Sequence, residues 1–189
     1  MCRASRLCTY ERTPCHDQGM TDWRDYLGLD DTALFAQCEF DRFRASGPGG
    51  QKRNKTESAV RLRHTPTSLT GEANESRSQH ENRARALRRL RLTIAVTLCA
   101  PVDIEAYAPP PALAAALLKP PGARASGRIE VMAALFDLLD ASGWRLADAA
   151  RTAGVSTAAI GRLLASDNEV WRAASERRAG LGLTAMRRG

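Results

Sequence analysis

A short stretch rich in glycine and proline, residues 46–56, constrains the fold of this chain more than any other; it reads Ser-Gly-Pro-Gly-Gly-Gln-Lys-Arg-Asn-Lys-Thr. Glycine costs conformational entropy in regular structure and proline has no N–H donor, so the run from Gly47 to Gly50 cannot form the interior of a helix or a strand. We therefore predict a loop with the amide of Gln51 at its tip. Lysine and arginine at positions 52, 53 and 55 indicate a polyanionic partner.

The residues on both sides of this loop predict a small β-sheet. Apolar and polar residues alternate over 38–44 and again over 58–64, where Val60 and Leu62 fall on one face and Arg61 and Arg63 on the other. A turn at 65–68 would let residues 69–75 return as a pairing strand. Ahead of the sheet, residues 22–36 predict one short acidic helix.

A long helix is predicted after the sheet. Ser78 and Glu81 have the spacing of a capping box, which marks a helix start. Leu87, Leu90 and Ile94 then lie near one face, while arginines cover the others. The sequence thus predicts an α+β fold in which a small sheet packs on one long helix.

We expect four regions along the chain. Residues 1–19 are predicted to be a disordered extension, with Met20 as a plausible start, and residues 20–100 form the α+β domain. Prolines at 109–111 and 120–121 make residues 101–127 a predicted semi-rigid Pro/Ala-rich linker. Residues 128–189 are predicted to be all-α, and two short helices joined at 153–156 resemble a helix-turn-helix.

The positive charge is concentrated around the loop. Residues 42–91 hold 13 lysines and arginines against 4 acidic residues, whereas the whole chain has a net charge of +7. Such a patch is typical of a nucleic-acid partner, although a solvated basic face is the alternative. The five cysteines have no metal-ligand spacing, so we expect no metal and a reducing compartment. We expect a cytoplasmic protein that binds no membrane, with the mitochondrial matrix as the alternative, since arginines occur at positions 3, 6 and 12.

Three motifs together resemble one protein family. They are Ser46-Gly47-x-Gly49-Gly50-Gln51-x-x-Asn54-Lys55-Thr56, His64-x-Pro66-Thr67 and Arg77-Ser78-Gln79-x-x-Asn82. Over residues 38–98 the chain resembles the catalytic domain of class I peptide chain release factors and their ribosome-rescue relatives. The resemblance implies hydrolysis of peptidyl-tRNA on the ribosome, with no cofactor, by a protein that we expect to be a monomer.

The resemblance also assigns roles to residues. It implies that Gly49, Gly50 and Gln51 are catalytic: the glycines aim the backbone N–H of Gln51 at the developing oxyanion, and its side chain positions water. Gln51 is also a candidate for N-methylation by a dedicated glutamine methyltransferase. His64 and His80 receive no catalytic role. The residues expected to contact large-subunit ribosomal RNA are Lys52, Arg53, Asn54, Lys55, Arg77, Ser78, Gln79, Asn82 and Arg83.

The chain also departs from the family. Lys52 and Arg53 replace a frequent His-Val pair, and Ser68 stands where the family usually has glycine. Only about 40 residues precede the loop, which leaves no room for a codon-reading domain, so the prediction is a codon-independent hydrolase that rescues stalled ribosomes. Two alternatives stay open: a non-catalytic ribosome- or rRNA-binding module, and a DNA-binding regulator that uses the helix-turn-helix.

Overall fold

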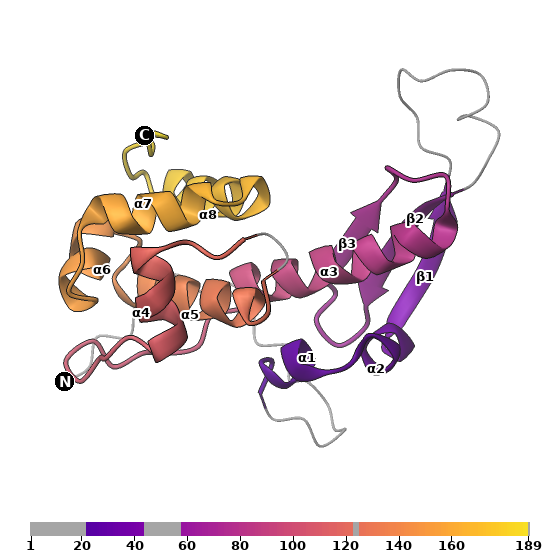
Figure 1. Ribbon diagram of the computed structural model, residues 1–189, viewed down its shortest axis with the longest axis horizontal. Helices are drawn as coiled ribbons and strands as arrows, with labels where there is room; N and C mark the ends of the chain where they lie inside the picture. Colours follow the sequence, from indigo (N-terminus) through magenta and orange to yellow (C-terminus); the bar gives the residue numbers. More distant parts are fainter. Residues whose placement is uncertain (1–21, 44–57, 123–124, 189) are drawn as a thin grey trace.

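A three-stranded sheet, one long helix and a helical bundle make up the described part of the chain, which comprises residues 22–43, 58–122 and 125–188 of a computed structural model. The sheet is an antiparallel meander in the order β1 (Cys38–Phe43), β2 (Ala59–His64) and β3 (Thr70–Ala73). Helix α3 (Gln79–Thr97) runs from the sheet toward the bundle (Figure 1). The predicted combination of a small sheet with a long helix is confirmed.

The central strand β2 has one buried and one exposed face, as its alternation predicts. Val60 and Leu62 are fully buried, and Leu62 pairs with Phe40 of β1 and with Gly71 of β3. On the outer face Arg61 contacts Glu72 at 2.5 Å. Exposed pairs of this kind contribute little to stability, so the buried face of β2 is what holds the sheet on α3.

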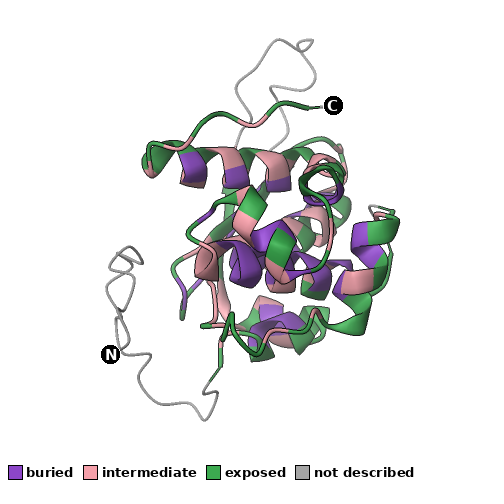
Figure 2. Ribbon diagram, turned by 90° about the vertical axis from the view of Figure 1, so that its left-hand side faces the viewer, coloured by how far each residue is buried: buried purple, intermediate pink, exposed green. Residues whose placement is uncertain are grey.

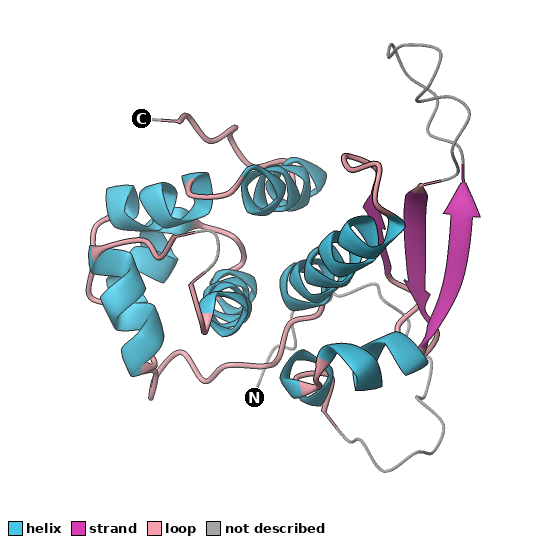
Figure 3. Ribbon diagram, turned by 45° about the vertical axis from the view of Figure 1, so that its right-hand side comes forward, coloured by secondary structure: helices cyan, strands magenta, loops and turns pink. Residues whose placement is uncertain are grey.

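Helix α3 begins where the sequence predicts. Ser78 is its N-cap, and the Ser78 hydroxyl accepts a hydrogen bond from the N–H of Glu81 at 3.4 Å. Leu90 and Ile94 are fully buried with the sheet in one hydrophobic cluster, whereas Leu92 belongs to the cluster of the helical bundle. Helix α3 therefore lies between the sheet and the helical bundle and contributes residues to the hydrophobic core of each (Figure 3).

The N-terminal segment forms two short helices, where one was expected. They are α1 (Asp25–Gly28) and α2 (Asp31–Ala36). The Asp30 side chain accepts hydrogen bonds from the N–H groups of Thr32 and Ala33, both at 2.8 Å, and so begins a new helix. A second N-cap inside the predicted helix accounts for the difference.

His64 has a structural role in this fold. Its ring is fully buried, with Nε2 at 3.1 Å from Gln37 Oε1 and Nδ1 at 2.8 Å from Thr67 Oγ1. Because an amide oxygen only accepts, Nε2 carries the proton and Nδ1 accepts from the Thr67 hydroxyl. Burial lowers the pKa of His64 to about 4, so the ring is neutral near pH 7.

Ser68, in the turn between β2 and β3, has a backbone conformation that favours glycine. Its φ is +57° and its side chain is exposed. We expect Ser68→Gly to raise the free energy of unfolding by about 0.5 kcal/mol, since glycine removes the left-handed strain but gains freedom in the unfolded chain. Urea unfolding measures this change. Ser68→Ala, which keeps the Cβ, should bring no gain, and an equal effect of both variants would contradict the strain argument.

Five helices follow α3 and pack around a core of their own. They are α4 (Pro111–Leu118), α5 (Arg128–Ala141), α6 (Leu146–Thr152), α7 (Thr157–Ala165) and α8 (Asn168–Gly180). The segment 101–127, expected to be a linker, contains α4, whose Leu113 and Leu117 are buried in this core. Part of that segment is thus packed, while the division of the chain into domains stays a prediction. None of the described helices is long and apolar enough to cross a membrane.

Helices α6 and α7 are joined by a tight turn. Gly154 has φ +68°, the N–H of Val155 donates to the carbonyl of Ala150, and Ser156 caps α7 through the N–H of Ala159. The inner side of α7 is buried through Ile160, Leu163 and Leu164. In Figure 2 the buried positions of the bundle face inward in the same way.

Candidate functional site

The two strands that flank the glycine-rich stretch hold its ends together. Strand β1 ends at Phe43 and β2 begins at Ala59, and these two residues pair in the antiparallel ladder. The end of β1 therefore lies beside the start of β2. The sequence-predicted residues Gly49, Gly50, Gln51, Lys52, Arg53, Asn54 and Lys55 lie outside the described residues.

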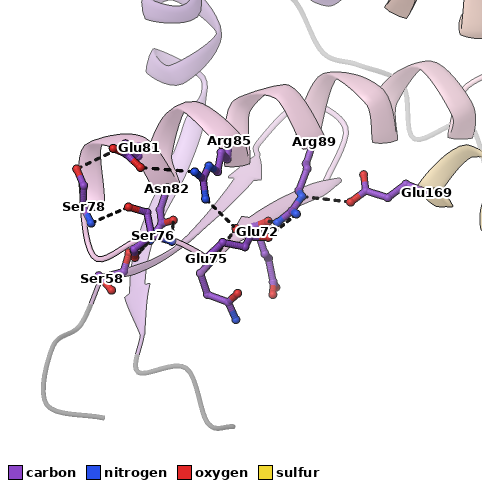
Figure 4. A network of polar contacts seen from close by, with 11 residues as sticks. Ser58, Glu72, Glu75, Ser76, Ser78, Glu81, Asn82, Arg85, Arg89 and Glu169 are labelled. Carbon is purple, nitrogen blue, oxygen red and sulfur yellow. Dashed lines mark hydrogen bonds and ion pairs between the residues drawn. The ribbon is translucent and has the colours of Figure 1, made fainter. Parts of the chain in front are cut away.

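Asn82, on the first turns of α3, fixes the described end of this stretch. Its side-chain amide donates to the carbonyl of Ser58 at 2.6 Å and to the carbonyl of Ser76 at 2.8 Å, and its oxygen accepts from the Ser76 N–H at 2.9 Å. Asn82 is fully buried. Both amide hydrogens are thus used inside the protein, and three segments meet at one side chain (Figure 4).

This position changes the role expected for Asn82. The sequence placed it among the RNA-contacting residues, but a side chain without exposed surface cannot touch RNA in this conformation. Its hydrogen bonds instead make it a positioning residue for the strand end beside the loop. The asparagine was visible in the motif, whereas its partners at Ser58 and Ser76 were not, because they come together only in the folded chain.

The other α3 residues named by the sequence surround the helix start. Ser78 is half-buried and occupied as N-cap, and its own N–H donates to Ser76 Oγ at 3.0 Å. Glu81 therefore does not complete the second half of the capping box; its carboxylate instead lies 3.5 Å from Arg85. Gln79 is half-buried, and Arg77 is exposed.

Arg83 is exposed but stacks against a neighbouring helix. Its guanidinium lies 4.7 Å from the centre of the Phe35 ring of α2. Such cation–π contacts are weak at exposed sites, so the charge of Arg83 stays available to an anion in solvent. Arg77 and Arg83 are thus the described candidates for RNA contact near the loop, and that role remains a prediction.

Two further arginines of α3, Arg85 and Arg89, form ion pairs with carboxylates. Arg89 contacts the carboxylate of Glu75 and the carbonyl of Glu72, and it lies 3.1 Å from Glu169 of α8 (Figure 4). Burial would raise the pKa of Glu75, but the hydrogen bond and charge of Arg89 lower it overall, so Glu75 is ionised near pH 7. Arg89 therefore joins the β3–α3 connection to the bundle.

The described residues on either side of residues 44–57 are held by hydrogen bonds and ion pairs. Among residues 22–43, 58–122 and 125–188, no group of three or more histidine, cysteine, aspartate or glutamate side chains is arranged to hold a metal ion. What the described residues provide is a rigid base of hydrogen bonds under the loop, flanked by exposed cations.

Comparison with known proteins identifies this part of the chain. The sequence model of the RF-1 domain matches residues 34–103, which include the loop, the sheet and α3. Residues 34–103 form an RF-1 domain. The RF-1 domain is the catalytic domain of class I release factors, as the motifs predicted. Helices α4–α8 lie beyond the matched range.

Curated relatives carry the same segment within much longer chains. Peptide chain release factor 1 of Leptothrix cholodnii is 58% identical over 52 residues, which cover 28% of this chain and 14% of the relative. Peptide chain release factor 1 of Acidiphilium cryptum is 57% identical over 56 residues, which cover 30% of this chain and 16% of the relative. Peptide chain release factor 2 of Paramagnetospirillum magneticum is 40% identical over 93 residues, which cover 47% of this chain and 25% of the relative. The chain thus spans between about a seventh and a quarter of these relatives, so the similarity is to their RF-1 domain region.

Proposed function

We propose that this chain hydrolyses peptidyl-tRNA on the ribosome without reading a codon, and so releases nascent peptides from stalled ribosomes. The observation that carries the proposal is the RF-1 domain, whose matched range contains Gly49, Gly50 and Gln51. Its partners are then peptidyl-tRNA and large-subunit ribosomal RNA, in the cytoplasm, with a glutamine methyltransferase acting on Gln51. We propose that the chain acts as a monomer.

The proposed chemistry needs little from acid–base side chains. Ester hydrolysis requires a positioned water and a donor for the oxyanion that develops on the ester carbonyl. The backbone N–H of Gln51 supplies that donor, and the Gln51 amide orients the water. His64 of β2 is buried and neutral, so it is not available as a general base.

Codon independence is supported by the helices that come after the RF-1 domain. Helices α4–α8 lie outside the range of the family model and pack on α3 through their own core. We propose that this bundle, rather than a codon, directs the RF-1 domain to its ribosomes. The exposed residues of α7 include Thr157 and Arg162, which leaves the DNA-binding alternative without a set of base-reading side chains.

The test compares two ribosome complexes that carry the same radiolabelled peptidyl-tRNA. One complex is stalled at the end of an mRNA without a stop codon, and the other holds a sense codon within intact mRNA. We expect release from the first complex by the purified full chain at substoichiometric amounts. Release only when a stop codon is supplied would overturn codon independence, and binding to ribosomes without any release would favour the non-catalytic module.

Asn82 allows a test of whether the strand end at Ser58 must be held in place for peptide release, apart from any effect on folding. We expect Asn82→Ala to slow peptide release by about tenfold or more, because the strand end at Ser58 loses its anchor and small displacements of reacting groups are costly. Unsatisfied carbonyls should also lower the free energy of unfolding by about 1–3 kcal/mol. Release is therefore measured at a temperature where circular dichroism shows both proteins folded.

The control for this prediction is Thr157→Ala, which changes an exposed polar residue at the start of α7. This control should release peptide at close to the normal rate. If Asn82→Ala, still folded, also releases at the normal rate, then Asn82 does not position the loop.

A further inference from the structure

A pocket of about 710 Å³ lies where the RF-1 domain meets the bundle, between α3, the start of α5 and the α7–α8 junction. Neither part of the chain forms it alone. Two carboxylates, Asp167 and Glu169, are among its lining residues. They are outnumbered by the arginines that line the pocket, which are Arg85, Arg88, Arg89, Arg91 and Arg128. The guanidinium of Arg91 is engaged by Asp31 and by the carbonyl of Leu29, so the other four are the cations relevant to a ligand in the pocket.

Arg88 is the cation with most freedom in this pocket. It is exposed, and it makes no ion pair or hydrogen bond with the described residues. Arg85 and Arg89 lie three residues before it and one after it on α3, so the three guanidinium groups surround one turn of the helix. A ligand that approaches Arg88 therefore meets two further cations.

A phosphate group can replace the carboxylates that pair with Arg85 and Arg89. Arg85 is 4.0 Å from Glu75 and 3.5 Å from Glu81, and these side chains are each between 37% and 57% exposed. Arg89 divides its contacts between Glu75 and Glu169. Exposed ion pairs contribute little to stability, so a phosphate can replace a carboxylate on either arginine at small cost.

The opposite wall of the pocket is fixed. Arg128 is 4% exposed, and its guanidinium donates to the carbonyl of Pro121 at 2.8 Å and to Asp167 at 3.2 Å. Asp167 also caps α8 by accepting from the N–H of Glu169. Since its charge is neutralised by Arg128 and it is held as a cap, Asp167 opposes an incoming anion only weakly. Glu169 is then the one acid that directly competes for the pocket's mobile cations among the described lining residues.

Apolar side chains complete the lining. Leu92, Ala125 and Ile129 face the pocket between the arginines. A lining that combines arginines with apolar side chains suits a chain of phosphates and sugars, since the phosphates pair with arginine and the sugars pack on the apolar part.

We propose that this pocket binds the phosphodiester backbone of an RNA strand, with Arg88 in direct contact and with Arg85 and Arg89 transferring from their carboxylates to phosphate. The inference rests on the proposed function only in identifying the RNA as ribosomal. It gives the bundle a role, because the bundle completes a second RNA contact on the middle turns of α3.

The first test measures binding of a fluorescein-labelled single-stranded 12-nucleotide RNA to the full chain over a salt series. We expect Arg88→Gln to weaken binding about tenfold and to reduce the slope of log K against log salt by about 1, as for the loss of one phosphate contact. The control is Arg151→Gln on α6, which removes the same charge from an exposed arginine far from the pocket. It should change the affinity less than about twofold. Equal losses in both variants would overturn the site, since they would report net charge alone.

A second pair of variants should act in the opposite direction. Glu169→Gln removes the competing acid and frees Arg89, so RNA binding should tighten about threefold. Its control is Glu176→Gln, also on α8 and also paired with an arginine, Arg172, but outside the pocket. No difference between these two variants would contradict the proposed exchange of carboxylate for phosphate.

A competitor tests the identity of the ligand. A 12-residue oligoglutamate peptide should displace the RNA poorly, and displacement as effective as that by unlabelled RNA would overturn an RNA site in favour of an acidic protein partner. Binding is measured without ribosomes or peptide release. A chain that fails to release peptide can thus still show the RNA site, and a chain that releases peptide can lack it.

Discussion

Gly50→Ala is expected to slow peptide release by about 10²–10³-fold, the usual cost of losing one oxyanion donor. A Cβ at position 50 closes backbone conformations that glycine alone reaches easily, and the proposed mechanism needs such a conformation to aim the N–H of Gln51 at the oxyanion. Single-turnover release from ribosomes without a stop codon measures the effect, because product dissociation does not limit that rate.

Two comparisons make this prediction specific. Gln51→Ala keeps the backbone N–H and should lose no more activity than Gly50→Ala. Gly161→Ala, in the middle of α7, places a Cβ where no heavy atom lies within 4 Å, and it should retain full activity. A fully active Gly50→Ala would show that the backbone donor is not the main source of rate.

Gly71→Ala is expected to lower the free energy of unfolding by about 3 kcal/mol, because overpacking a tight interface forces backbone shifts. A Cβ at position 71 would lie 2.3 Å from the carbonyl oxygen of Ala86 and 2.7 Å from the backbone nitrogen of Leu90. These are backbone atoms of α3, so no side-chain rotation relieves the clash. Strand β3 and α3 must separate, which weakens the packing around Leu62 and Leu90.

Urea unfolding followed by circular dichroism measures the change, with Gly161→Ala as the control. Alanine favours helix over glycine by about 1 kcal/mol, so the control should unfold at the same or higher urea concentration. If the two variants were equally stable, the close approach of β3 to α3 would not be a constraint on this fold.

Local patterns predicted the parts of the fold that depend on neighbouring residues. Burial alternates with period 2 from Val60 to His64, and Ser78 begins a helix whose apolar spacing gives a buried stripe. Strand β2 and helix α3 could therefore be placed from the sequence. The contacts that hold α3 against β3 could not. Nothing in the residues around Gly71 indicates which backbone comes within reach of its missing Cβ.

Residue types and spacing singled out Gly49–Gln51 and the start of α3 as the candidate site, and that assignment stays a prediction. The partners of Asn82 and Arg89 depend on which segments the tertiary structure brings together, and Glu169 is 80 residues from Arg89 along the chain. Helix α4 was also underestimated, because its prolines at 110 and 111 read as a spacer although proline is well suited to the first turn of a helix.

The shared helix α3 has a mechanical consequence. Its 19 residues make a rod about 28 Å long, with Asn82 and the strand end at one end and the bundle at the other. Both ends are clamped by buried side chains, so the rod transmits rotation with little bending. A tilt of about 10° imposed at the bundle would move the opposite end by roughly 5 Å, which is close to the rise of one helical turn. In this sense α3 is a lever that connects the bundle to Asn82 and to the strand end at Ser58.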